Sequence, residues 1–235
     1  MAAFTFFFHP MSRSQIARWA LHEVGADYEP VRVEWDARPA ALLAANPMGK
    51  LPTIIHHHGG HDHVVSEGAA VCHYLAATHP QAGLLPGEHE MADYFRWLFF
   101  AAGPLEQAAT AKMFGWEVPA PQEMAAGFGN YERTMDALDG WLSAHDHVCG
   151  ERFTMADVYL GSHVEWGLAF KSFPERSSFA AYLERFSSYF VTYAGLASIM
   201  IAIVFLYIVS VIFFMGGELN AAIRRYLEAR ARIIG

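Results

Sequence analysis

The hydrophobic pattern of this 235-residue chain changes at about residue 80, and this change limits the folds that it can adopt. Before that point short strand-like runs alternate with helical segments, and beyond it only helical periodicity remains. The expected elements are a strand over 4–8, a helix closed by Gly25, a strand over 28–35, a helix over 39–45, strands over 52–55 and 62–65 around a turn at 59–60, and a helix over 67–77. The order β-α-β-α-β-β-α predicts a compact α/β half whose sheet ends in a hairpin.

The second half of the chain is expected to be helical throughout. Pro and Gly residues between 79 and 87 indicate a linker. The expected helices after it run roughly over 91–114, 121–144, 154–170 and 178–186. The chain therefore combines an α/β half with an all-α half.

Composition excludes several classes of protein. Hydrophobic residues make up 54% of the chain and charged residues 17%, which excludes intrinsic disorder. Acidic residues outnumber basic ones by 24 to 16, which argues against nucleic-acid binding. The two cysteines, Cys72 and Cys149, are expected to be buried thiols rather than a disulfide. The N-terminal segment lacks a basic region before its apolar run, so it is interpreted as a strand rather than a signal peptide.

Three motifs follow one another along the chain. Residues 46–54, NPMGKLPTI, place an X-Pro step before a strand, and residues 66–75, SEGAAVCHYL, place an acidic residue at a helix start. In residues 150–157, GERFTMAD, Thr154 can cap a helix while Asp157 reaches back to its N–H. Together these motifs resemble the glutathione S-transferase family, over residues 1 to about 186.

This resemblance implies a thioredoxin-like, glutathione-binding domain over residues 1–80 and a helical transferase domain over residues 90–186. It implies that Pro52 follows a cis peptide bond, and that Leu51 offers its backbone N–H and C=O to the cysteinyl part of glutathione. Lys50 is expected near the glycyl end of the tripeptide.

The same resemblance assigns the γ-glutamyl end of glutathione to the helix that starts after Ser66. Free N–H groups there are expected to hold the carboxylate, and Glu67 is expected to accept a bond from the amino group. Gly68 stands where the family usually has Ser, so one hydroxyl donor is missing. Read without the family, Glu67 is only a first-turn acid favoured by the helix dipole.

The sequence offers several candidates for the residue that activates the thiol. The family adds the glutathione thiolate to an electrophile, and a hydroxyl at the start of the first helix lowers the thiol pKa. The position of the family's catalytic Ser or Thr falls on Met11, and that of the cysteine in bacterial beta-type members falls on Arg13. We expect Ser12 to contact the thiolate. Ser14 and the positive charge of Arg13 are the alternative candidates for stabilising it. The alternative is that Ser12 or Ser14 is only an N-cap.

Aromatic residues of the helical half are candidates for the electrophile pocket, although at helical spacing most such residues belong to a core. These are Trp97, Phe99, Phe100, Phe114 and Trp116. The histidine-rich segment 56–63 lies on an expected hairpin and is interpreted as a solvated loop rather than a metal site. No cofactor is expected, because glutathione is a co-substrate.

The C-terminal segment departs from the family pattern. No charged residue occurs from 186 to 217, and residues 189–216 are predicted to form a transmembrane helix, followed by an Arg-rich tail over 217–235. The last 45 or so residues resemble the final membrane helix of YihY/BrkB-like inner-membrane proteins. The positive-inside rule places the Arg-rich tail in the cytoplasm, which conflicts with a cytoplasmic transferase half.

The sequence thus leads to a glutathione S-transferase that conjugates glutathione to small hydrophobic electrophiles in detoxification. We expect a homodimer, tethered by a single-pass membrane helix with its transferase domain in the cytoplasm. A soluble cytoplasmic protein is the alternative localisation. The alternative functions are a non-catalytic interaction module with this fold, and a chimeric chain that joins a truncated transferase to a membrane-protein fragment.

Overall fold

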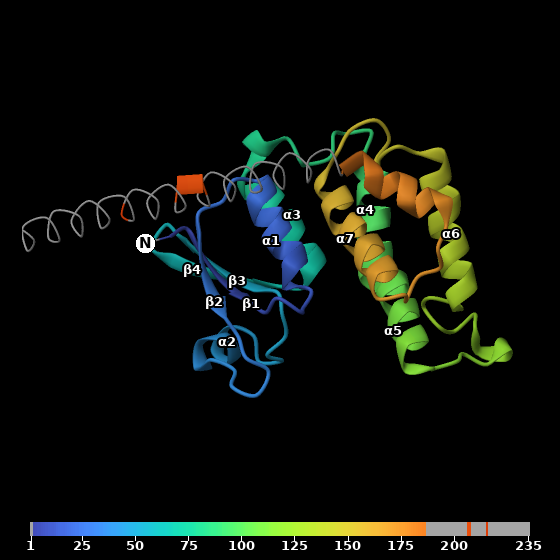
Figure 1. The fold of residues 1–235 in the computed structure, drawn as a ribbon, viewed down its shortest axis with the longest axis horizontal. Coiled ribbons are helices and arrows are strands. Elements are labelled where there is room, and N and C mark those ends of the chain that lie inside the picture. Colours follow the sequence, from blue (N-terminus) through green and yellow to red (C-terminus); the bar gives the residue numbers. More distant parts are fainter. Residues whose placement is uncertain (1, 187–205, 208–214, 216–235) are drawn as a thin grey trace, which may run out of the picture. The chain divides into compact units, whose positions relative to one another are not determined.

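The computed structural model describes residues 2–186, 206–207 and 215 of the chain. Contacts divide the chain into two compact units, Met1–Arg185 and Phe186–Gly235. The helices and strands with defined bounds all lie in the first unit (Figure 1).

A four-stranded sheet organises the N-terminal half. Its strands are β1 (Phe4–Phe8), β2 (Tyr28–Arg32), β3 (Thr53–His58) and β4 (His61–Ser66), in the spatial order β2-β1-β3-β4. β1 runs parallel to β2 and antiparallel to β3, and β3 and β4 form a hairpin that turns at Gly59 and Gly60, both with positive φ. The predicted order β-α-β-α-β-β-α is confirmed.

Helices cover both faces of this sheet. α1 (Ser14–Glu23) and α3 (Gly68–Thr78) pack together on one face, where the guanidinium of Arg18 lies 4.2 Å from the centre of the Phe8 ring (Figure 1). The short α2 (Ala40–Ala45) lies on the other face, where Leu42 packs with Phe7 and Val33. Successive side chains of β1 point to opposite faces of the sheet, so this one strand packs against α1 and α3 on one face and against α2 on the other.

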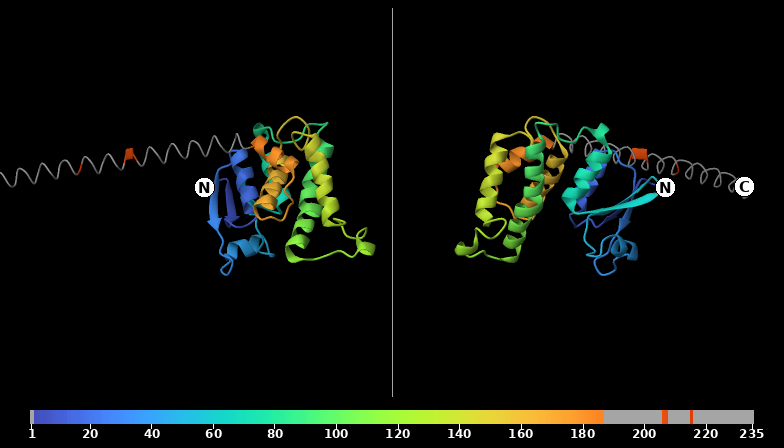
Figure 2. Two further views of the ribbon diagram at one scale, coloured as in Figure 1. Left: turned by 45° about the vertical axis from the view of Figure 1, so that its right-hand side comes forward. Right: turned by 180° about the vertical axis from the view of Figure 1, so that it is seen from behind.

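The helical half begins with one long helical segment. α4 (Met91–Phe100) continues through a π-helical turn (Ala101–Leu105) into α5 (Glu106–Phe114). Pro104 lies inside the wider turn, and because proline has no N–H to donate, the helix widens there instead of breaking. α6 (Tyr131–Ala144), α7 (Met155–Ala169) and helical residues 177–186 complete this half (Figure 2).

Three predicted boundaries are wrong. The strand expected over 52–55 continues to His58, where it pairs with β4. The helix expected over 121–144 begins only at Tyr131, where the Asn130 side chain accepts the Arg133 N–H at 2.8 Å. Gly129, with φ +67°, and the prolines before it prevent an earlier start. The second strand ends at Arg32 rather than residue 35, and Trp35 instead lies against the ring of His9.

Helix α7 forms the core of the helical half, and its N-terminus is fixed by a buried carboxylate. Asp157 accepts the N–H of Thr154 at 2.8 Å and its hydroxyl at 3.0 Å, which confirms the predicted contact. It also accepts the N–H of Val148 and the hydroxyl of Tyr182. This single side chain therefore joins α7 to the preceding loop and to residues 177–186.

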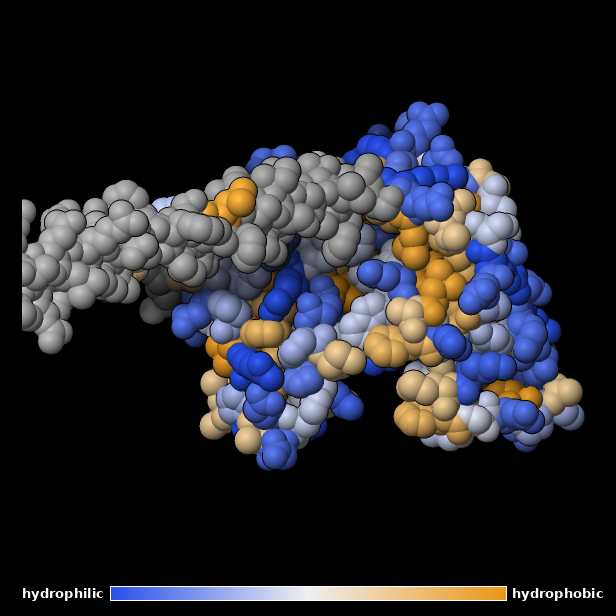
Figure 3. Space-filling model, in the orientation of Figure 1, coloured by the Kyte–Doolittle hydropathy of each residue, from blue (hydrophilic) through white to orange (hydrophobic). Residues whose placement is uncertain are grey.

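Apolar and polar residues are distributed unevenly over the surface of the helical half. The outward-facing α6 is largely hydrophilic, whereas apolar surface gathers near α7 (Figure 3). Within the described residues, no helix combines the length and apolar character needed to cross a membrane. The predicted span over 189–216 lies outside the described residues, apart from 206–207 and 215.

Candidate functional site

The strand register brings three sequence motifs to one edge of the sheet. Phe7 of β1 pairs with Thr53 of β3, and Thr53 pairs with Ser66 of β4, so these residues form one row across three strands. The loop that leads into α1 follows this row, Pro52 precedes it, and Glu67 follows it. Segments far apart in the sequence therefore meet where β1 and β4 end and β3 begins.

Leu51 presents free backbone groups at this edge. The Leu51–Pro52 peptide bond is cis, which confirms the expectation. Within the described chain neither the N–H nor the C=O of Leu51 has a hydrogen-bond partner. The neighbouring carbonyl of Lys50 accepts the Thr53 hydroxyl at 2.9 Å, which holds the turn, while the Lys50 side chain is exposed. Leu51 is thus free to pair with an extended peptide, as β-strand addition requires.

Glu67 connects β4 to α3 in an unusual conformation. Its φ of +69° makes it one of two non-glycine residues with positive φ in the described part of the chain. Such a conformation costs about 1–3 kcal/mol and is typical of functional sites. The Glu67 side chain is exposed, and Gly68 begins the helix directly after it. The carboxylate of Glu67 is therefore accessible beside the N-terminus of α3.

Ser12 and Ser14 hold the loop before α1. Ser14 is fully buried, and its hydroxyl donates to the His9 carbonyl at 3.0 Å and accepts the His9 N–H at 3.1 Å. Ser12 is half-buried and accepts the Ser14 N–H, while its hydroxyl lies 2.9 Å from the His9 carbonyl and 2.7 Å from the Ser14 hydroxyl. Ser14 is thus enclosed, whereas Ser12 is the hydroxyl that a ligand can reach.

Arg13 contacts the helical half. Its guanidinium forms an ion pair with Glu106, the first residue of α5, and half of the arginine side chain remains exposed. The second carboxylate oxygen of Glu106 lies 3.6 Å from Nδ1 of His163 on α7. Side chains from the residue that precedes α1, from α5 and from α7 thus meet beside the N-terminus of α1.

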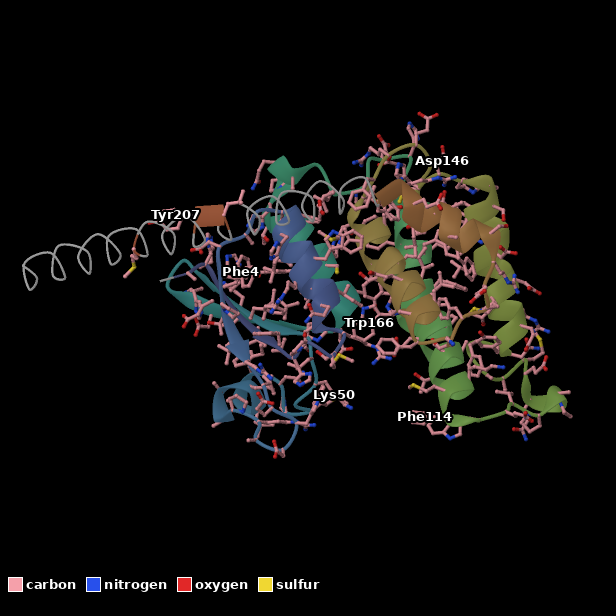
Figure 4. All side chains as sticks on the ribbon, in the orientation of Figure 1. Phe4, Lys50, Phe114, Asp146, Trp166 and Tyr207 are labelled. Atoms are coloured by element: carbon pink, nitrogen blue, oxygen red, sulfur yellow. The ribbon has the colours of Figure 1, made fainter. Side chains whose placement is uncertain are left out.

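A cavity of about 210 Å³ opens next to these charges. Arg13, which precedes α1, and Ile16 of α1 form one wall, and residues of α5, of α7 and of the turn after α7 form the others. Its aromatic lining comes from α7 and the turn after it, namely Trp166, Phe170 and Phe173, with Trp166 placed on α7 in Figure 4. A cavity with apolar walls and a few charges at one side suits a small hydrophobic ligand.

The aromatic residues expected to line this cavity lie elsewhere. Trp97 is a core residue that packs against Trp141, and Phe99, Phe114 and Trp116 are exposed away from the cavity walls. Phe114 ends α5 at a distance from Trp166 (Figure 4). Trp116 lines a second hollow, beside Val118 and Phe128.

His163 and Glu106 are site residues that the sequence analysis missed. His163 is buried, and burial lowers its pKa to about 4. Its Nε2 has no hydrogen-bond partner among the described residues. The signal available in the sequence is a polar pair, Ser162 and His163, inside an otherwise largely apolar helix.

The remaining titratable groups do not add to the site. The described residues contain no cluster of three or more His, Cys, Asp or Glu side chains arranged to hold a metal. Cys72 and Cys149 are buried free thiols, as expected, and burial raises the pKa of Cys149 to about 11. Neither thiol is activated for nucleophilic chemistry.

Comparison with known proteins places these features in a family. The models "Glutathione S-transferase, N-terminal domain" and "Glutathione S-transferase, C-terminal domain" match residues 10–78 and 101–192. Glutathione S-transferase GstA of Escherichia coli O157:H7 is 27% identical over 171 residues, which cover 70% of this chain and 83% of GstA. Glutathione S-transferase 1 of Schizosaccharomyces pombe is 27% identical over 158 residues, which cover 63% of this chain and 66% of the yeast protein.

Solved structures show the same fold. The glutathione transferase of Methylococcus capsulatus str. Bath superposes with a TM-score of 0.62 at 25% identity, covering 79% of this chain and 93% of its own. A sphingomonad glutathione S-transferase complexed with glutathione gives a TM-score of 0.55 at 26% identity, covering 77% and 97% of the two chains. Both family models, the curated relatives and the fold agree, and the chain belongs to the glutathione S-transferase family.

Proposed function

We propose that the chain is a glutathione transferase that adds the thiolate of glutathione to a small hydrophobic electrophile. The observation that carries the proposal is the row of Phe7, Thr53 and Ser66, which gathers the α1 loop, Leu51 and Glu67 at one sheet edge. The cavity lined by α1, α5 and α7 shares Arg13 with that edge. A peptide thiol bound at the edge would thus face an apolar space for its acceptor.

Each end of the tripeptide has a partner of matching chemistry in this proposal. Leu51 pairs with the cysteinyl backbone, and Lys50 lies near the glycyl carboxylate as a point charge. Glu67 accepts a charge-assisted bond from the γ-glutamyl amino group, and the N-terminus of α3, at Gly68, receives the carboxylate.

Ser12 is the proposed contact of the sulfur. Its hydroxyl turns from the His9 carbonyl or Ser14 to donate to the thiolate, and the α1 dipole and Arg13 add positive potential. The thiol loses its proton to solvent, the thiolate that Ser12 stabilises forms the carbon–sulfur bond, and the electrophile either expels a leaving group or takes up a proton. Ser14, buried beneath, keeps the loop in place.

Substituting Ser12 by Ala tests this role. We expect turnover of an aryl halide or Michael acceptor to fall about 10- to 100-fold, while the Kd for glutathione changes less than about threefold. The pKa of bound glutathione, followed by thiolate absorbance, should rise. Ser143→Ala, an exposed serine on α6, is the matched control. Unchanged turnover in Ser12→Ala would remove Ser12 from the mechanism.

The internal bonds of Ser12 give weight to one alternative, a non-catalytic glutathione-binding module. In that case the chain binds glutathione but turns over no electrophile from a broad panel. Tethering to a membrane is a separate proposal, supported by the uncharged sequence from 186 to 217 and its resemblance to YihY/BrkB-like proteins. Homodimer formation is proposed from the family resemblance.

A further inference from the structure

The start of α3 has more hydrogen-bond donors than the protein uses. Within the described residues, the N–H groups of Gly68, Ala69 and Ala70 have no acceptor, and the first N–H to be satisfied is that of Val71, by the Glu67 carbonyl. Glu67, as the preceding residue, caps no N–H with its side chain. An eleven-residue helix that leaves its first turn open is prepared for an anionic group.

Tyr159, a residue of the helical half, occupies the space next to Gly68. A Cβ atom placed on Gly68 would lie 3.0 Å from Cε2 and 3.6 Å from the hydroxyl oxygen of Tyr159, which is on α7. A serine at position 68 would therefore press against the tyrosine ring. Glycine at this position lets the two helices approach, and it brings the phenol to the open turn of α3.

The Tyr159 side chain is largely buried, and its hydroxyl is available to a ligand. Only 6% of the tyrosine surface is exposed, and no hydrogen bond to its hydroxyl occurs among the described residues. The ring is held edge-on against His163, with centroids 4.8 Å apart. Burial raises the pKa of Tyr159 well above its usual value, so the group stays a donor at neutral pH. A tyrosine that is largely buried usually has a hydrogen-bond partner for its hydroxyl, and a ligand at the start of α3 can supply the acceptor.

We propose that the Tyr159 hydroxyl donates a hydrogen bond to the γ-glutamyl carboxylate of glutathione at the N-terminus of α3. This role rests on the proposed function, and it makes up for the hydroxyl that Gly68 lacks. The carboxylate then receives donors from both halves, backbone N–H groups from α3 and the phenol from α7. Tyr159 is a specificity-determining residue, because its hydrogen bond favours ligands that have a free carboxylate on the γ-glutamyl group.

Tyr159→Phe removes the donor and keeps the ring that packs on Gly68. By calorimetric titration of the full chain, we expect glutathione to bind about 10-fold more weakly to Tyr159→Phe, as for loss of one bond to a charged group. A glutathione analogue with its γ-glutamyl carboxylate converted to the carboxamide should lose much less affinity on the same substitution. Tyr74→Phe on α3, whose hydroxyl contacts His56, is the matched control and should bind glutathione like the unaltered chain.

A second pair of variants separates binding from folding. Tyr159→Leu should also bind weakly, and Gly68→Ser combined with Tyr159→Leu should regain most of the affinity, because serine then enters the vacated space with its own hydroxyl. Equal glutathione affinity of Tyr159→Phe and the unaltered chain would overturn the role of Tyr159 alone. No binding by the unaltered chain would overturn the proposed function, and the role of Tyr159 with it.

Discussion

Single side chains in this protein show why a motif can be found from sequence while its partners are missed. Leu51 and Glu67 stand in contiguous motifs, so their meeting at one sheet edge could be predicted from the resemblance, whereas Ser12 lies one residue from the position of the family's catalytic hydroxyl. Tyr159 and His163 come from a helix whose sequence has no unusual spacing, and they reach the site only because α7 packs on α1 and α3. No pattern in the sequence predicts such a contact between helices.

His163 should make the stability of the protein depend on pH. Its pKa is lowered from 6.5 to about 4 by burial, so the folded state favours the neutral imidazole. The contribution of neutral His163 to the free energy of unfolding is complete above pH 6.5. It is lost as the pH falls toward 4, which lowers the free energy of unfolding by at most about 3 kcal/mol. In His163→Gln, denaturant unfolding should therefore show a shallower loss of stability across this range.

His22→Gln serves as the comparison, since His22 is exposed on α1. Its pH profile should follow that of the unaltered chain. If His163→Gln loses stability with the same pH dependence as the unaltered chain, the imidazole is not the group that titrates.

The sequence predicts helices and strands well where the hydrophobic pattern is periodic, and poorly where a turn sets the end of the element. The segment 91–114 was recognised as helical, but its π-helical turn at Pro104 follows from how a proline is accommodated, which periodicity does not report. The start of α6 was placed too early because Gly129 outweighs the helix-forming residues near it. Such outcomes depend on backbone conformation at one residue rather than on the average over a window.

Two helix-interior glycines should respond to alanine in opposite ways. A Cβ on Gly167 of α7 would lie 2.3 Å from the ring of Phe173, a buried residue that lines the cavity. Gly167→Ala should cost roughly 1–3 kcal/mol of unfolding free energy by overpacking. Gly140→Ala on α6, where nothing lies within 4 Å, should instead stabilise by about 0.5–1 kcal/mol. Chemical denaturation measures both, and a stabilising Gly167→Ala would show that Phe173 does not pack on α7 as described.

The first unit of the chain carries its own core up to its last helical residues. Phe179 and Tyr182 are fully buried, and the Tyr182 hydroxyl bonds to Asp157. We therefore expect a chain that ends after Phe186 to unfold cooperatively with nearly the melting temperature of the full chain. A chain that ends after Phe173 should fail to fold, because it loses both aromatic residues and leaves Asp157 with one donor fewer.

Cell fractionation of the same pair tests the sequence prediction for residues 189–216. The full chain should sediment with membranes, and the chain that ends after Phe186 should not. Aggregation of the shorter chain would instead favour the truncated-transferase hypothesis, in which the helical half is incomplete.

Glutathione binding by the full chain is the central claim, and a titration calorimeter measures it directly. The matched ligand is the α-linked tripeptide Glu-Cys-Gly, which has the same atoms but presents its glutamyl carboxylate and amino group differently. The site at Leu51, Glu67 and Gly68 predicts one glutathione per chain, with a Kd of roughly 1 µM to 1 mM, and at least about 10-fold weaker binding of the α-linked peptide. Equal binding of the two peptides, or no binding of either, would contradict it.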